Sequence, residues 1–114
     1  MSAEFVICVY RPKSKGDPLF REALEEHLDV LDQGGYLASR QHLVMESEKD
    51  GAILELLEWK SKEAAGHAHN DPNVQAVWGK LSESAELLAL KDLSEAGETF
   101  PHFRGYVPPE SAGS

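Results

Sequence analysis

Apolar and polar positions follow two different periods along the chain, and the first stretch has the period of a strand. Residues 4–11 are a short run rich in β-branched and aromatic residues that ends at Pro12, which predicts a strand. Both of its faces are apolar, so the predicted strand is covered on both sides. One face carries Phe5, Ile7 and Val9, and the other carries Val6, Cys8 and Tyr10.

The next stretch has a helical period. Asp17 and Pro18 are a typical helix start, with Asp17 as the N-cap and Pro18 at the first helical position. Apolar residues then recur at helical spacing until Gly34 and Gly35 end the helix. The apolar stripe consists of Phe20, Leu24, His27, Leu28 and Leu31.

A hairpin is predicted in the middle of the chain. Residues 37–47 indicate a second strand with one more polar face, and residues 52–60 indicate a third strand. Between them, Lys49-Asp50-Gly51 is a hairpin signal. The more polar face of the second strand carries Arg40, His42, Val44 and Glu46.

Two helices and a last strand are predicted in the second half. Ser61 is a cap for a short helix over 62–69, and Asp71-Pro72 repeats the helix-start signal. Residues 87–93 are then predicted as the last strand. The apolar stripe of that helix is predicted to include Val74, Val77, Trp78, Leu81, Ala85 and Leu88.

The predicted order is strand, helix, strand, strand, helix, strand, which is typical of a ferredoxin-like α+β fold with a four-stranded antiparallel sheet. Two helices cover one face of such a sheet. Because the first and third strands are apolar on both faces, the second face is expected to be an interface. A second copy would cover it most simply, so we expect a homodimer with two-fold symmetry. The domain is predicted to span 1–106, followed by a flexible tail over 107–114.

Composition narrows the class of protein further. The chain has 114 residues, a formal charge of −9 and one cysteine, Cys8. It has no apolar run of about 20 residues, which a membrane span requires, and no secretory signal pattern at its start. An acidic chain repels phosphate backbones, so we expect no nucleic-acid partner and no membrane. The expected location is the cytoplasm, where cysteines stay reduced.

Several segments carry a resemblance to a known family over residues 4–104. These segments are Glu58-Trp59-Lys60-Ser61, then Lys62 to Ala65, His67-Ala68-His69, Asp71 to Val74, and Leu90 to Leu93, which leads to Phe100 and Phe103. Through them the chain resembles the antibiotic biosynthesis monooxygenase family, which belongs to the dimeric α/β-barrel superfamily.

The resemblance implies a function. Family members oxidise electron-rich aromatics such as quinols with dioxygen, without metal or flavin, so we expect a cofactor-independent monooxygenase with a small aromatic ligand and no cofactor. Such chemistry needs an apolar pocket, hydrogen-bond donors for a developing oxyanion, and a base. Trp78 stands near the position where haem-degrading relatives carry the axial His. Because Trp cannot bind iron, this position counts against haem degradation. The alternatives are a non-catalytic small-molecule-binding or stress-associated barrel protein, and a structural dimer whose pocket is filled by its own side chains.

Candidate catalytic residues follow from the same resemblance. His67 and His69 lie where many relatives carry a His, and His69 is the better match. They are two positions apart, so they point to different faces of a helix, and the spacing does not fit a helical zinc pair, so no metal site is expected. For each of them, the simpler interpretation is an exposed histidine at a helix end.

The expected substrate-binding residues are Trp59, Trp78, Asn70, Tyr36 and His42. Trp59 matches the Trp at the end of the third strand in the family and would form a wall of the pocket. The simpler interpretations are packing for Trp59, helix capping for Asn70, and a solvent or dimer face for His42.

Two further residues have open interpretations. His27 lies on the apolar stripe of the first helix, where it would point into the pocket or make one hydrogen bond at the edge of the core. Glu55 stands among Ile53, Leu54, Leu56 and Leu57, so burial would raise its pKa and allow it to act as a base. An ion pair of Glu55 with Arg40 or Arg11 across the dimer is the favoured interpretation.

The aromatic segment from Phe100 to Tyr106 is expected to pack across the dimer.

Overall fold

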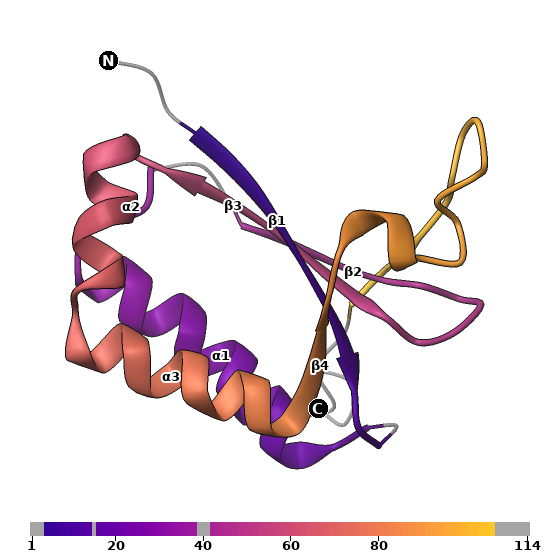
Figure 1. The fold of residues 1–114 in the computed structure, drawn as a ribbon, viewed down its shortest axis with the longest axis horizontal. Helices are drawn as coiled ribbons and strands as arrows, with labels where there is room; N and C mark the ends of the chain where they lie inside the picture. The colour runs from indigo at the N-terminus through magenta and orange to yellow at the C-terminus, as the bar shows by residue number, and fades with distance from the viewer. Residues whose placement is uncertain (1–3, 15, 39–41, 107–114) are drawn as a thin grey trace.

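The computed structural model describes residues 4–14, 16–38 and 42–106, and it has an α+β architecture (Figure 1). The antiparallel sheet has five strands in the order β4-β1-β3-β2-β5. The strands are β1 (Glu4–Pro12), β2 (Leu43–Glu46), β3 (Ile53–Trp59), β4 (Ala85–Leu88) and β5 (Arg104–Gly105). The helices are α1 (Pro18–Gln33), α2 (Lys62–His69) and α3 (Pro72–Ser84), followed by a 3-10 turn over Leu90–Asp92.

This architecture differs in part from the predicted one. The order β4-β1-β3-β2 of the first four strands is compatible with a ferredoxin-like fold. The difference is a fifth strand, two residues long, beside β2. Three helices lie in the described part of the chain, since both helix-start signals after β3 begin a helix, as predicted. None of the helices in the described ranges is long and apolar enough to cross a membrane.

The starts of the three helices and the end of α1 form where the sequence predicts them. The Asp17 side chain accepts a hydrogen bond of 2.9 Å from the backbone N–H of Leu19, and Pro18 opens α1. After Gly34, Gly35 has a φ of +74°, a backbone conformation that glycine adopts without strain. The Ser61 hydroxyl accepts a hydrogen bond of 3.0 Å from the backbone N–H of Ala64 and begins α2.

The predicted hairpin is also present, with a shorter first strand. β3 closely matches the predicted third strand, whereas β2 covers only Leu43–Glu46 of the predicted 37–47. The backbone N–H of Ser47 donates to the carbonyl of Ala52 over 2.8 Å, and Gly51 has a φ of +75° in the turn. Residues 39–41, which include Arg40, lie outside the described residues.

The predicted last strand is present, but its predicted bounds were wrong. Ala85 and Leu88 do not continue the helical stripe: α3 ends at Ser84, and Ala85 is already extended, with a φ of −149°. Ala85 pairs with Pro12 and Leu88 pairs with Val9, so β4 comes earlier than the predicted 87–93. The pairing with β1 decides this boundary, because the apolar residues here fit either period.

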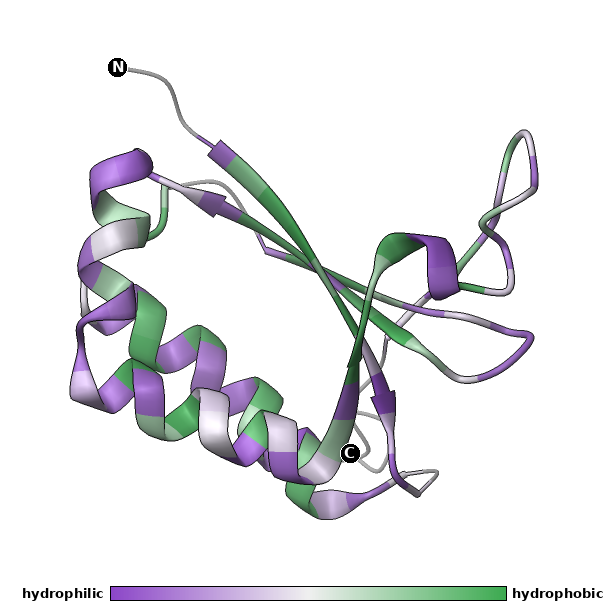
Figure 2. Cartoon of the chain, in the orientation of Figure 1, coloured by the Kyte–Doolittle hydropathy of each residue, from purple (hydrophilic) through white to green (hydrophobic). Residues whose placement is uncertain are grey.

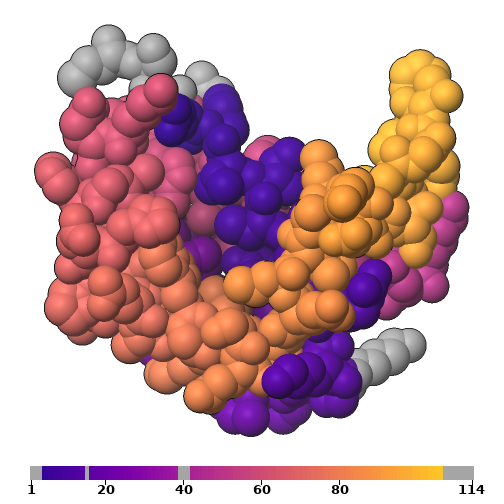
Figure 3. Space-filling model, viewed as in Figure 1, coloured from indigo at the N-terminus to yellow at the C-terminus, as the bar shows by residue number. Residues whose placement is uncertain are grey.

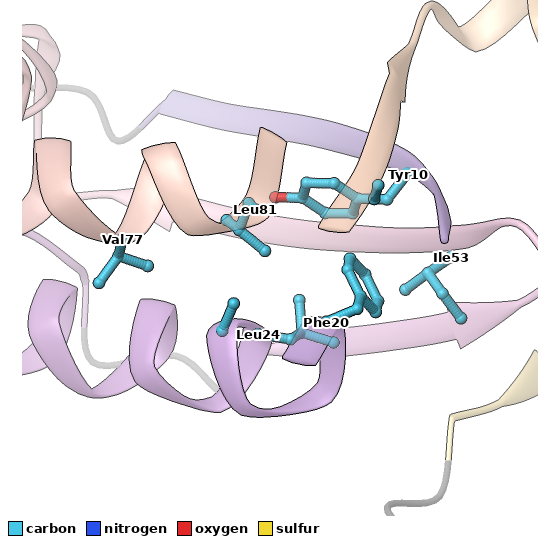
Figure 4. Close-up of a cluster of buried hydrophobic side chains, with 8 residues drawn as sticks. Tyr10, Phe20, Leu24, Ile53, Val77 and Leu81 are labelled. Carbon is cyan, nitrogen blue, oxygen red and sulfur yellow. The ribbon is translucent and has the colours of Figure 1, made fainter. Parts of the chain in front are cut away.

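One face of the sheet packs against α1 and α3. Figure 4 shows the cluster on this side, where the side chains of Tyr10 and Ile53 from the sheet meet those of Phe20, Leu81 and Val77 from the helices. The rings of Tyr10 and Phe20 meet edge to face with their centroids 5.5 Å apart. In Figure 2, β1 and β3 are largely green, whereas green and purple residues alternate around the helices, as expected for elements that bury one side.

The opposite face of the sheet is covered only in part. One row across β1, β3 and β2 consists of Val9, Leu54 and Met45, and it packs against Leu93 and Phe103 from the C-terminal segment. The next row, which we call the open row, consists of Ile7, Leu56 and Leu43. In the open row Ile7 is 47% exposed and Leu43 is 51% exposed, whereas Val9 and Leu54 are buried.

The C-terminal aromatic residues differ from one another in their packing. Phe103 packs on the covered row, and Tyr106 packs against the cluster around Tyr10 and Phe20 on the other face, so both contact their own chain. Phe100 is 80% exposed. Within the single chain, β5 pairs with β2 and holds Phe103 and Tyr106 against their own sheet, and the expectation that this segment packs across a dimer stays a prediction.

Candidate functional site

A cavity of about 350 Å³ lies between β1 and the helices. In Figure 3 the surface is hollowed where β1, in indigo, lies between α2 and α3 and the β4 segment. β4 pairs with β1 only over Val9 to Pro12, so no described strand covers the other half of that edge. The cavity is lined by Val6, Ile7, Cys8, Val9, Tyr10, His27, Leu57, Trp59, Ala65, His69, Trp78, Leu81, Leu87 and Leu88. Its wall is mostly apolar, as in typical small-molecule sites.

A buried carboxylate lies beside this cavity. Side chains of β3 alternate between the two faces of the sheet, and Glu55 is the one charged residue among Ile53, Leu57 and Trp59 on the face towards the helices. Its side chain has no exposed surface. An unpaired charge in this place would be very costly, so its hydrogen-bond partners decide how it is tolerated.

Three side chains from three separate parts of the chain donate hydrogen bonds to Glu55. The Tyr10 hydroxyl of β1 donates to Oε1 over 2.8 Å. Nδ1 of His27, on α1, lies 3.0 Å from Oε1 and 3.1 Å from Oε2. Nε2 of His42, just before β2, lies 2.9 Å from Oε2. The carboxylate is therefore satisfied by one phenol and two imidazoles.

These donors decide the ionisation state of Glu55. Burial by itself would raise the pKa of this carboxyl group. The hydrogen bonds from His27 and His42, with the nearby His27 and the Tyr10 hydroxyl, outweigh burial and bring the pKa down to about 2. Glu55 is therefore ionised at neutral pH, and it is not the raised-pKa base considered from the sequence.

The two neighbours of the His27 ring identify its tautomer. Ionised Glu55 can only accept hydrogen bonds, so Nδ1 of His27 carries a proton. Nε1 of Trp78 can only donate, and it lies 3.0 Å from Nε2 of His27, so Nε2 accepts. His27 is thus a neutral imidazole whose basic atom, Nε2, is bound to the indole N–H of Trp78.

This arrangement can hold a proton. If Nε2 took a proton from a bound molecule, the resulting imidazolium would lie against the Glu55 carboxylate, which stabilises it. The thiol of Cys8 and the phenol of Tyr10, which also line the wall, keep their protons at neutral pH and do not act as bases there. Burial, followed by the charge of Glu55, raises the pKa of the Cys8 thiol to about 11 and raises the pKa of the Tyr10 phenol further above its usual value.

Three of the expected site residues line the cavity. Trp59 is buried and also packs against α2 and α3 through Ala68 and Val74, so it forms a wall and part of the core. Trp78 is half-buried, and its ring meets that of His69 edge to face with centroids 4.8 Å apart. His69 is exposed, so it lies at the rim of the cavity.

The other expected site residues lie elsewhere. His67 is exposed on α2 and does not line the cavity. Asn70 ends α2, and its side-chain amide donates to the carbonyl of Gly66 over 3.3 Å. The Tyr36 hydroxyl donates to Asp71 over 2.7 Å, and Asp71 caps α3. His42 does not line the cavity and is connected to it only through Glu55.

The interpretation of Glu55 as an ion-pair partner of an arginine is not what the structure shows. Arg11 pairs with Asp50 over 3.1 Å, and Arg40 lies outside the described residues. Glu55 lies under the helices, so it faces away from the side where a dimer was expected. In the sequence, the sign of this contact was that Glu55 and His27 each occupy a position in an apolar stripe. The two residues lie 28 positions apart along the chain, and the stripes do not show that they meet.

A second cavity of about 460 Å³ lies near the hairpin and the start of α1. Charged residues of its wall pair with each other: Arg11 with Asp50, and Arg104 with Glu46, each over 3.1 Å. Because these groups already satisfy one another, this cavity offers a ligand less than the cavity beside His27. Among the described residues, no group of three or more His, Cys, Asp or Glu side chains forms a potential metal site.

Comparisons with known proteins add a fold relationship. No family model and no curated protein matches the chain. Among solved structures, the chain is similar to Rv0793 from Mycobacterium tuberculosis, with a TM-score of 0.62 and 17% sequence identity, over 82% of this chain and 99% of that chain. At this level of identity the similarity concerns the fold alone.

Proposed function

We propose that the protein is a cofactor-independent monooxygenase that oxidises a small, electron-rich aromatic or quinol-like molecule in the cavity beside β1. The observation that carries this proposal is a histidine, His27, that lines an apolar cavity and is held from behind by the buried carboxylate of Glu55. The resemblance to the antibiotic biosynthesis monooxygenase family supports the choice of reaction.

The chemistry requires little from the protein. Once deprotonated, the substrate itself supplies electrons to dioxygen. For an anthrone-like substrate, the reacting CH₂ carbon loses both hydrogens, one oxygen atom of O₂ becomes its carbonyl oxygen, and the other leaves as water. No external reductant is needed. His27 accepts the substrate proton at Nε2, Glu55 stabilises the imidazolium, and the apolar wall keeps water away from the anion.

We further propose a ferredoxin-like homodimer that uses the open row. Ile7, Leu56 and Leu43 are a row of apolar side chains on a sheet face, and they continue directly from the covered row. The chain's own C-terminal segment covers one half of the face and leaves the other. A second copy brings an identical apolar row of the same shape, so two open rows can bury each other across a two-fold axis.

A second candidate is a non-catalytic binding protein. One observation favours it: the indole N–H of Trp78 occupies Nε2 of His27, so the basic atom is already bonded. In that case the cavity binds an aromatic ligand without deprotonating it.

Oxygen consumption tests the proposal. Metal-free protein is mixed with a panel of quinols and anthrones, and dioxygen uptake is compared for wild type, His27→Gln, His69→Ala and His67→Ala. We expect His27→Gln to lower turnover by about 10²–10⁴-fold, because a general base is lost. We expect His67→Ala to match the wild type, since this side chain lies away from the cavity.

Circular dichroism of each variant checks that the fold is kept. Full turnover in His27→Gln, or a loss that follows His69 instead, would contradict the assignment of the base. If no substrate gives uptake but the cavity binds aromatic ligands, the second candidate is the correct function.

A further inference from the structure

Two polar groups of the cavity wall, the indole N–H of Trp78 and Nε2 of His27, form a hydrogen bond with each other. The indole N–H of Trp78 donates to Nε2 of His27 over 3.0 Å, and both residues line the cavity. The indole has one donor and no acceptor, and Nε2 in this tautomer has one acceptor and no donor. A ligand that enters between them must therefore satisfy a donor and an acceptor that face each other.

The rest of the wall offers a polar ligand few partners. Its side chains include Val6, Leu57, Leu81 and Leu87, which are apolar. The Tyr10 hydroxyl is engaged with Glu55. His69 also lines the cavity, but it lies at the exposed rim and not inside. A polar group of a bound aromatic molecule is thus directed to Trp78 and His27.

We propose that Trp78 and His27 form a recognition site for a neutral hydroxyl group on an aromatic ligand, a substrate class that rests on the cavity assigned in the proposed function. A hydroxyl oxygen accepts from the indole N–H while its proton is donated to Nε2, so one hydrogen bond is exchanged for two. A carbonyl or an ether can only accept, and it leaves Nε2 of His27 without a donor, which is costly in an apolar site. A carboxylate has the same defect and is repelled by the charge of Glu55.

His27 and Trp78 differ in how far their side chains can move. His27 is buried and is fixed through Nδ1 by both oxygens of Glu55. Trp78 is half-buried, and its ring edge lies against His69, which is exposed at the rim. Trp78 is therefore the residue that moves to admit the hydroxyl. In a quinol-like substrate, the same hydroxyl then delivers its proton to Nε2 of His27, the atom assigned as the base.

Ligand binding to the intact chain tests this inference without turnover. Isothermal titration calorimetry compares 2-naphthol with 2-methoxynaphthalene, which keeps the oxygen as an acceptor but removes its proton. We expect 2-naphthol to bind wild type at least about ten-fold more tightly, because only it satisfies Nε2. In Trp78→Phe, which keeps an aromatic ring but loses the donor, we expect this preference to fall to about three-fold or less.

His67→Ala is the matched control, because His67 lies on the neighbouring helix outside the cavity, and it should keep the wild-type preference. Should Trp78→Phe fold poorly, two-dimensional NMR of the wild type gives a second measurement: the indole N–H signal of Trp78 should shift with 2-naphthol and much less with its methyl ether. Equal affinity for the two ligands, or a full preference in Trp78→Phe, would overturn the inference. A clear preference without any oxygen uptake would support it and would instead contradict the monooxygenase proposal.

Discussion

Glu55 connects side chains that come from three separate parts of the chain. It accepts hydrogen bonds from Tyr10 of β1, His27 of α1 and His42 beside β2, and it has no exposed surface. A buried carboxylate is stable only because its donors replace water, and here those donors also include the proposed base. At the scale of the residue, stability and the proposed chemistry therefore depend on the same atoms.

Replacing Glu55 tests this dependence through pH. In Glu55→Gln, the amide NH₂ would face the hydrogen-bond donors of Tyr10, His27 and His42. We therefore expect a loss of about 2–4 kcal/mol in the free energy of unfolding near pH 5. The pKa of Glu55 is lowered from 4.5 to about 2 in the folded state. Its stabilisation is therefore complete above pH 4.5 and is lost as the pH falls towards 2. The gap between wild type and Glu55→Gln should shrink accordingly.

Urea unfolding at pH 5 and pH 2.5 measures this gap. The control is Glu25→Gln, which changes an exposed carboxylate on α1 and should match wild type at both pH values. An equal gap at the two pH values would show that the charge of Glu55 is not what the network stabilises.

The helices that border the cavity begin at well-defined caps. Ser61, Asp71 and Asp17 each accept a hydrogen bond from a backbone N–H of the first turn. α2 has only eight residues, too few for a helix to be stable by itself in water. Because α2 carries His69 at the rim, its cap contributes to the shape of the cavity as well as to the stability of the helix.

Removal of this cap has a predictable cost. In Ser61→Ala the backbone N–H of Ala64 loses its acceptor, so we expect the free energy of unfolding to fall by about 1 kcal/mol, measured by urea unfolding. Ser82→Ala is the matched control: its exposed hydroxyl bonds only carbonyls within α3, and the change should stay within about 0.5 kcal/mol. Equal losses in the two variants would mean that the cap of α2 contributes nothing specific.

At the scale of the whole molecule, one face of the sheet is covered and the other is covered only in part. α1 and α3 cover one side of the sheet, whereas the C-terminal segment covers only part of the other and leaves the open row exposed. Exposed apolar side chains that continue a buried row differ from single apolar residues scattered over a surface, which need no explanation. This difference is the reason for the proposed dimer.

The dimer is tested by placing a charge in the open row. We expect wild type to sediment as a dimer, and Ile7→Glu to weaken dimerisation by at least about thirty-fold, because a buried charge would have no partner. Leu19→Glu is the matched control: Leu19 is 68% exposed on α1, away from the open row, and the variant should remain a dimer. Analytical ultracentrifugation measures both. A wild-type monomer at high concentration, or an unaffected Ile7→Glu dimer, would refute this interface.

Local signals in the sequence determined most of the elements. Asp-Pro pairs, Ser61 and the glycines act over a few residues, so the starts of the three helices, the end of α1 and the hairpin are predictable from neighbours along the chain. The end of α3 was not, because Ala85 and Leu88 suit either period and only their pairing with β1 selects the strand. The family resemblance, rather than the stripe patterns, suggested Trp59 and His69 as site residues beside Trp78 of the helical stripe, and all three line one cavity.

Which partners meet inside that space was decided by the tertiary structure. A stripe tells which side of an element is buried, but not which residue of another element it faces. The contact between His27 and Glu55 spans 28 positions, and the contact between Trp78 and His27 spans 51. The tautomer of His27, the ionisation of Glu55 and the separation of the covered row from the open row all follow from such distant contacts, since a hydrogen bond and a packed surface depend on position in space and not on distance along the chain.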